Sequence, residues 1–203
     1  MKKMRLVVLI EIAIFAAFAL VLDLLPSIHL GGSGSISIAM VPIFIIAFRW
    51  GFKASVAAGF LWGLLQIVTG DLQALAFWQV ILEYFLAFAC IGLSGLFMPA
   101  IQNNLKNGEK GTAYLLMVAG ILIGSFVRYF WHFLAGVTIW AQYAPEGQSA
   151  LAYSLFYNGI PFVGASILCS IAVVILLGTA PRLVLNRPAG RTGGYYSGNT
   201  EAK

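Results

Sequence analysis

The distribution of charge along this chain most strongly limits the folds that it can adopt. Almost all charged residues lie between or beyond long apolar stretches, which themselves carry very few charges. The chain is 61% hydrophobic and 9% charged, whereas a soluble domain carries roughly a quarter charged residues. Long apolar runs without charge are typical of membrane-spanning helices. We therefore expect an all-α integral membrane protein embedded in a lipid bilayer.

Six transmembrane helices are predicted, separated by polar or glycine-rich loops and closed in two cases by Pro26 and Pro99. The second helix is expected to start with a proline, Pro42. The expected helices cover residues 4–25, 38–50, 53–69, 73–98, 111–140 and 154–180. Residues 1–180 are predicted to form one six-helix domain, and residues 181–203 a cytoplasmic polar tail. The second and third helices are short, which favours a cavity near the outer face.

The basic residues are distributed asymmetrically over the predicted loops. Eleven of the 12 Lys and Arg residues fall at the termini, in the 2/3 loop or in the 4/5 loop. The opposite loops contain Asp71 and Glu146, with Asp23 nearby. Because positively charged loops stay in the cytoplasm, both termini are predicted to be cytoplasmic in the cell membrane. The basic residues that give the net charge of +5 lie at the ends of the apolar spans, which argues against a nucleic-acid partner.

A polar and aromatic cluster interrupts the apolar pattern between residues 124 and 158. Arg128, His132, Gly136 and Trp140 are spaced four apart, so on a helix they share one stripe. Polar groups inside a membrane are costly, and they mark functional sites by default. His132 offers a donor or acceptor, Gly136 leaves a gap without a side chain, and Trp140 offers a flat ring. This combination suits a small planar polar ligand. The alternatives are a helix–helix hydrogen bond for His132 and an interfacial aromatic belt for Trp140.

Further candidates come from the helices on either side of this stripe. Glu83 and Tyr84 lie in the middle of the fourth predicted helix. Glu83 could form a structural ion pair with Arg128, or it could face an outer cavity and contact a cationic ligand. Tyr153 and Asn158 flank the start of the sixth helix, where Asn158 offers both a donor and an acceptor. A hydrogen bond at the helix start is the alternative for this pair.

Ala13 and Ala17 lie four residues apart on one face of the first predicted helix. Small residues at this spacing allow close approach of another helix, either from a partner or from within the same bundle.

Enzymatic function is not expected from this sequence. It contains no HExxH, Walker A or Gly-x-Ser-x-Gly motif, and no disulfide, metal site or cofactor is implied by Cys90 and Cys169 in their apolar runs. The chain also contains no ATPase motif, so energy for any transport must come from elsewhere.

Four segments resemble the thiamine-specific S component of energy-coupling-factor (ECF) transporters. They are LIEIAIFAAFA, SISIAMVPIFIIAFRWGFKASVAAGFLWGLLQ, VILEYFLAF and RYFWHFLAGVTIWAQYAPEGQSALAYSLFYNG. This resemblance covers about residues 5–180 and implies a six-helix S-component bundle with a thiamine site near the outer face. It also implies partnership with a transmembrane T component and two cytoplasmic ATPases.

The resemblance further implies roles for individual residues. The matching pocket residues are Glu83, Tyr84, His132, Gly136, Trp140, Tyr153 and Asn158, with Trp62 from the third helix. Ala13 and Ala17 match the motif that docks the T component. One departure lies in the first outer loop, where relatives can supply a tryptophan lid and this chain reads HLGGSGSIS, leaving His29 as a candidate.

Three other functions remain open at this stage. The chain could be an S component for another vitamin, or a proton-coupled carrier that uses Glu83, Arg128 and His132 as a relay. The third is a membrane hydrolase.

Overall fold

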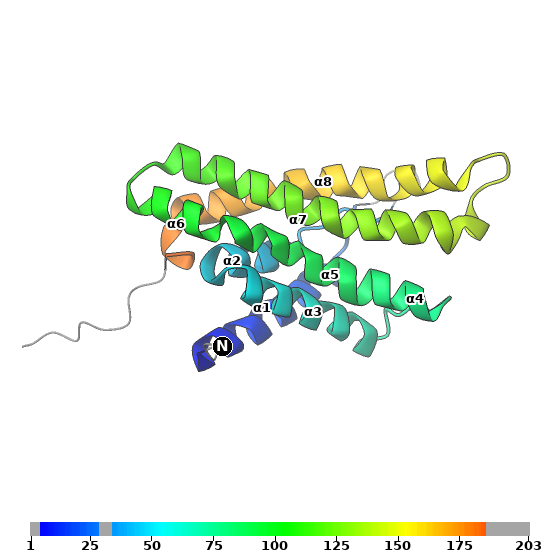
Figure 1. The fold of residues 1–203 in the computed structure, drawn as a ribbon, viewed down its shortest axis with the longest axis horizontal. Coiled ribbons are helices and arrows are strands. Elements are labelled where there is room, and N and C mark those ends of the chain that lie inside the picture. Colours follow the sequence, from blue (N-terminus) through cyan, green and yellow to red (C-terminus); the bar gives the residue numbers. More distant parts are fainter. Residues whose placement is uncertain (1–4, 29–33, 186–203) are drawn as a thin grey trace, which may run out of the picture.

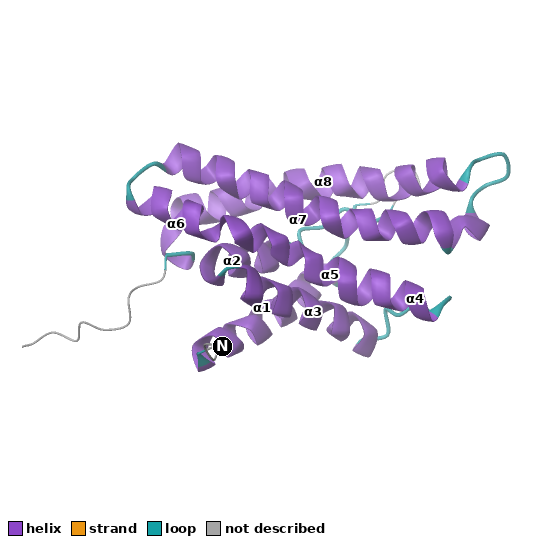
Figure 2. Ribbon diagram, viewed as in Figure 1, coloured by secondary structure: helices purple, strands orange, loops and turns teal. Residues whose placement is uncertain are grey.

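The computed structural model describes residues 5–28 and 34–185, and these residues are almost entirely helical (Figures 1 and 2). An isolated bridge between Ile28 and Ile36 is the only β feature in the described ranges. The principal single helices are α1 (Leu6–Asp23), α2 (Val41–Trp50), α3 (Phe52–Val68), α7 (Lys110–Thr138) and α8 (Ala150–Thr179). Between α3 and α7 lies one continuous helical run, which consists of α4 (Phe77–Val80), η1 (Ile81–Leu86), α5 (Ala87–Cys90), η2 (Ile91–Phe97) and α6 (Met98–Lys106). Two short turns, η3 (Trp140–Tyr143) and η4 (Pro181–Leu183), follow α7 and α8.

Four of these segments are long and apolar enough to cross a membrane. They are Leu6–Asp23, Phe77–Lys106, Lys110–Thr138 and Ala150–Thr179. Helices α2 and α3 are also apolar but shorter. The expected all-α membrane protein is therefore confirmed in this form, whereas a count of six crossings stays a prediction.

The buried core is built around α2. Eight of its ten residues, Val41 to Phe48, are buried, and Phe44 and Phe48 have no exposed surface. Helices α7 and α8 form a long antiparallel pair along one side of the molecule (Figure 1). Helix α2 is therefore surrounded by other helices of the bundle.

Helix α3 packs against the α4–α6 run at very short backbone distances. A Cβ atom at Gly63 would lie 1.8 Å from the carbonyl oxygen of Tyr84, and one at Gly59 would lie 2.2 Å from that of Phe88. Only glycine permits such an approach. The facing segment includes η1, a six-residue π-helical turn, and such turns are rare and frequently occur at functional sites.

Three predicted helix boundaries are wrong by four residues or more. The fourth helix starts at Phe77 and not at residue 73, since residues 71–76 form a loop. Pro99 does not end the fourth helix, because η2 precedes it and places Pro99 in the first turn of α6, where its missing N–H costs no hydrogen bond. The helix therefore continues to Lys106. Helix α8 starts at Ala150 and not at residue 154, because the Ser149 hydroxyl accepts a hydrogen bond from the Ala152 N–H at 3.2 Å and caps it. Helix α2 starts at Val41 and not at residue 38, and Pro42 lies in its first turn, in agreement with the expected proline at the helix start.

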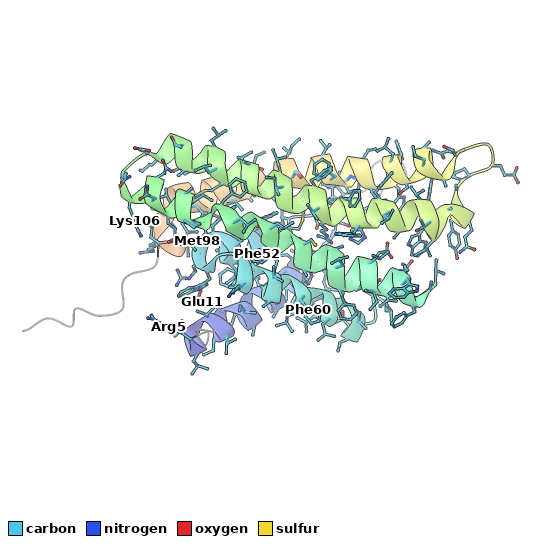
Figure 3. The ribbon with its side chains drawn as sticks, in the orientation of Figure 1. Arg5, Glu11, Phe52, Phe60, Met98 and Lys106 are labelled. Atoms are coloured by element: carbon cyan, nitrogen blue, oxygen red, sulfur yellow. The ribbon has the colours of Figure 1, made fainter. Side chains whose placement is uncertain are left out.

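Side chains near the start of α1 connect it to the end of α2. The Glu11 carboxylate accepts hydrogen bonds from Arg49 Nε at 2.6 Å and from Trp50 Nε1 at 2.7 Å. Figure 3 shows that Arg5 and Lys106 lie at the same end of the molecule as Glu11. Beyond Glu11, α1 buries Ile12, Ala16 and Ala19.

Candidate functional site

The main candidate site is a cavity of about 610 Å³ between the loop before α4, η1, the end of α7 and the start of α8. In Figure 1 these elements meet at the end of the molecule opposite α6. The cavity is lined by Gln73, Ala74, Leu75, Glu83, His132, Gly136, Trp140, Tyr143, Tyr153, Ser154, Tyr157 and Asn158. Six of the eight predicted pocket residues are thus brought together, from three separate parts of the chain.

Glu83 accepts hydrogen bonds from two side chains and lies beside the imidazole of a third. Trp140 Nε1 lies 3.1 and 3.2 Å from the two carboxylate oxygens, and Gln79 Nε2 donates to Oε2. His132 Nδ1 lies 3.5 Å from Oε1. Donors that converge on a carboxylate stabilise its charged form, so this site presents a negative charge to the cavity.

Arg128 does not pair with Glu83. Its guanidinium carbon lies 4.5 Å from the ring centroid of Phe88, 4.9 Å from that of Trp62 and 5.7 Å from that of Tyr129. Aromatic faces attract the guanidinium through their negative electrostatic potential. The structural ion pair considered for Glu83 is therefore not formed, and the carboxylate has no basic partner other than His132 among the described ion pairs.

Gly136 provides room for α8 as well as for the cavity. A Cβ atom there would lie 2.1 Å from the Ser154 hydroxyl, which donates to the Phe133 carbonyl at 2.7 Å. The Asn158 amide nitrogen donates to the Ser154 carbonyl at 3.1 Å. The gap without a side chain, predicted at position 136, is thus partly filled by Ser154 of the neighbouring helix.

Two predicted pocket residues lie outside the lining of the main cavity. Trp62 has no exposed surface and packs edge-on against Phe88, with 4.6 Å between ring centroids. Tyr84 lines a second, more polar cavity of about 210 Å³. Glu83, His132 and Trp140 line both cavities, so the two spaces adjoin at these side chains.

The sequence interpretation missed the loop that forms one wall of the main cavity. Gln73, Ala74 and Leu75 contribute to this wall, and they lie between α3 and α4. Partial burial raises the pKa of Asp71 at the start of the same loop. No motif marks these positions. The one feature of the sequence that could have pointed to this wall is Gln79, a polar residue one helical turn before Glu83.

The described part of the chain contains no group of three or more His, Cys, Asp or Glu residues that could hold a metal ion. Cys90 and Cys169 are both free thiols. The cavity lining offers one carboxylate, one imidazole, amide and hydroxyl groups, and aromatic rings.

Comparisons with known proteins identify relatives over most of the chain. Residues 9–185 match the family described as thiamine transporter protein (Thia_YuaJ). The thiamine transporter ThiT of Bacillus subtilis is 42% identical over 182 residues, covering 89% of this chain and 95% of that protein. ThiT of Lacticaseibacillus paracasei is 40% identical over 184 residues, covering 88% of this chain and 90% of that protein.

A solved structure agrees with these matches. ThiT from Listeria monocytogenes superimposes with a TM-score of 0.85 at 42% identity, covering 90% of this chain and 99% of that one. All these relatives are named as ThiT, and the two curated ones as transporters, which confirms the expectation that the function is not enzymatic. The chain belongs to the thiamine transporter (Thia_YuaJ) family.

Proposed function

We propose that this chain is the substrate-binding S subunit of an ECF-type transporter and that it captures thiamine from outside the cell. The observation that carries the proposal is a single carboxylate, Glu83, that faces a 610 Å³ cavity beside an indole and an imidazole. Thiamine combines a cationic thiazolium with a flat aminopyrimidine. Such a molecule requires a site with one negative charge, an aromatic face, and amide or imidazole groups.

Each lining residue has a role in this proposal. Glu83 contacts the cation, and Trp140 both stacks on the ligand and orients Glu83 through its indole N–H. Asn158 uses its amide nitrogen within the helix pair, which leaves its carbonyl oxygen to accept from the aminopyrimidine. Tyr153 and His132 complete the polar edge. Tyr84 and Trp62 support the site from behind, through the second cavity and the packing against Phe88.

Energy coupling is assigned to partners, namely a transmembrane T component and two cytoplasmic ATPases. Ala13 and Ala17 support this assignment, because both are exposed on α1 while Ile12 and Ala16 of the same helix are buried. Packing within the bundle therefore does not use these two alanines. An exposed pair of small residues leaves a shallow surface on which a partner helix can approach closely.

The proposed topology has six crossings with both termini in the cytoplasm, residues 1–180 as the transmembrane unit and the rest as a tail. The cavity then opens at the outer face, since the described Lys residues and all described Arg residues except Arg128 fall at span ends or loops assigned to the cytoplasm. His29, the candidate lid residue, lies outside the described residues.

Tryptophan fluorescence of the purified chain tests the choice of ligand. Thiamine should quench the signal at low concentration, because Trp140 lines the cavity. Riboflavin and biotin should not, and quenching by either one instead would make the chain an S component for a different vitamin. A Trp140→Phe variant is the control, since it should lose most of the quenching that arises in this cavity.

A further inference from the structure

Gln79 is a fully buried glutamine whose side-chain amide makes three hydrogen bonds. Its Oε1 accepts from the Leu75 backbone N–H at 3.0 Å, and its Nε2 donates to the Gln73 carbonyl at 2.8 Å. The second N–H of Nε2 donates to Glu83. Both donors and the acceptor of the amide are thus in use.

The loop backbone determines which way this amide faces. The Leu75 N–H can only donate and the Gln73 carbonyl can only accept. Rotating the Gln79 amide by 180° would place its N–H group against the Leu75 N–H and its oxygen against the Gln73 carbonyl, so both hydrogen bonds would be lost. The orientation that satisfies the backbone is also the one that directs an N–H to Glu83. The position of the loop and the environment of the carboxylate are therefore linked through one side chain.

The loop itself depends on side chains for its position. Residues 71–76 are exposed, and Gln73, Ala74 and Leu75 form a wall of the main cavity. Besides Gln79, Tyr84 holds this segment, because its hydroxyl donates to the Asp71 carbonyl at 2.6 Å and accepts from the Gln73 N–H at 3.2 Å. Loss of either side chain would leave backbone groups without these partners.

We infer that Gln79 is a positioning residue that couples the placement of loop 71–76 to the orientation of Glu83. When the loop lies against the cavity, the amide holds the carboxylate toward the cationic ligand. When the loop moves away, the carboxylate loses a donor. This inference rests on the proposed function, in which thiamine binds beside Glu83.

A double-mutant cycle between Gln79 and Glu83 tests the coupling. Gln79→Met keeps the length of the side chain and removes its hydrogen bonds, so thiamine affinity should fall about tenfold. In a Glu83→Gln background the same change should cost less than about twofold, because the group through which Gln79 acts is already altered. Equal losses in both backgrounds would overturn the inference, since a merely structural role predicts additive effects. If Gln79→Met does not fold, Gln79→Leu removes the same hydrogen bonds without adding a charge beside Glu83 and should show the same pattern.

A ligand-free measurement separates this inference from the proposed function. An Ala74→Cys reporter in a Cys90→Ser chain should react faster with a membrane-impermeant maleimide once Gln79 is replaced by Met. Gln102→Met is the matched control, because Gln102 is a buried glutamine that donates to the Phe48, Arg49 and Val184 carbonyls far from the cavity. It should lower the melting temperature and change neither the labelling rate nor the affinity.

The outcomes of the two arms are distinct. A wild-type chain that does not respond to thiamine would overturn the proposed function. An unchanged labelling rate in the Gln79→Met chain would overturn the role of Gln79, whatever the ligand is.

Discussion

At the scale of single residues, the proposed function assigns to Glu83 the contact that selects a cationic ligand. Glu83→Gln keeps the shape of the side chain and removes its charge. Thiamine binding should weaken by about 1.5–3 kcal/mol, which is tenfold or more, because a charge-assisted contact away from water is lost. An analogue with an uncharged ring in place of the thiazolium should lose much less on the same substitution. The measurement is a cycle of two proteins and two ligands by calorimetry.

Equal losses for the charged and the neutral ligand would contradict contact between Glu83 and the cation. The melting temperature of both proteins is recorded alongside. If Glu83 had a purely structural role, the Glu83→Gln substitution should lower the melting temperature. An ion pair between Glu83 and Arg128 would make the loss of stability large. The structure excludes this pair, since Arg128 lies among the rings of Trp62, Phe88 and Tyr129.

The sequence predicted the chemistry of individual site residues better than their contacts. The spacing predicts one stripe of Arg128, His132, Gly136 and Trp140. The last three line the main cavity, whereas Arg128 lies among aromatic rings outside its lining. Helical periodicity is local, so it can be read from one segment. The contact of Gly136 with Ser154 depends on how α7 and α8 pack against each other, and no local pattern contains that information.

At the scale of elements, α3 approaches the segment that carries Glu83 and Tyr84 through two glycines. Gly63→Ala should destabilise the protein by about 1–3 kcal/mol and weaken ligand binding, because the added Cβ would meet the Tyr84 carbonyl at 1.8 Å. Gly111→Ala in α7 is the control, since nothing lies within 4 Å of its added Cβ. Thermal unfolding in detergent and thiamine titration measure the two effects. Equal stability of both variants would mean that α3 can move away from η1 at little cost.

The exposed face of α1 gives a second prediction about a whole element. Ala13→Trp combined with Ala17→Trp should abolish assembly with the T component and transport, because large side chains prevent close helix approach. Thiamine binding should stay near normal, since neither alanine is buried in the bundle. Ile171→Trp with Ile175→Trp on α8 is the matched control, as both isoleucines are more than half exposed. Copurification and ligand titration distinguish the cases, and loss of binding in the α1 variant would indicate internal packing.

Helix boundaries show where local reasoning fails at this scale. Pro99 predicts a helix end from its own chemistry, but the η2 turn before it restarts the helix at Met98. The π-helical turn at Ile81–Leu86 has no counterpart in the hydrophobic pattern. Gly63 of α3 approaches the Tyr84 carbonyl within this turn, a tertiary contact that no local pattern contains.

At the scale of the molecule, the basic residues Arg5 and Lys106 and the cavity lie at opposite ends. The described basic side chains Arg5 and Lys106 lie at one end, whereas the cavity lies between the ends of α7 and α8 at the other (Figures 1 and 3). In the proposed topology the basic end faces the cytoplasm and the cavity faces outward, an arrangement that suits a subunit proposed to collect ligand outside the cell. This overall layout was predictable, because hydropathy and charge are averaged over many residues.

The same layout leads to a prediction about transport by the isolated chain. Vesicles that contain this chain alone should bind thiamine without concentrating it, because the sequence carries no nucleotide-binding motif. Adding a T component and its two ATPases, with ATP on the cytoplasmic side, should produce uptake above the external concentration. Radiolabelled thiamine measures both states. Concentrative uptake by the lone chain under a proton gradient would instead favour a carrier that uses Glu83, Arg128 and His132 as a proton relay. The position of Arg128 argues against that outcome, since its guanidinium lies among aromatic rings and is not paired with the carboxylate that such a relay would protonate.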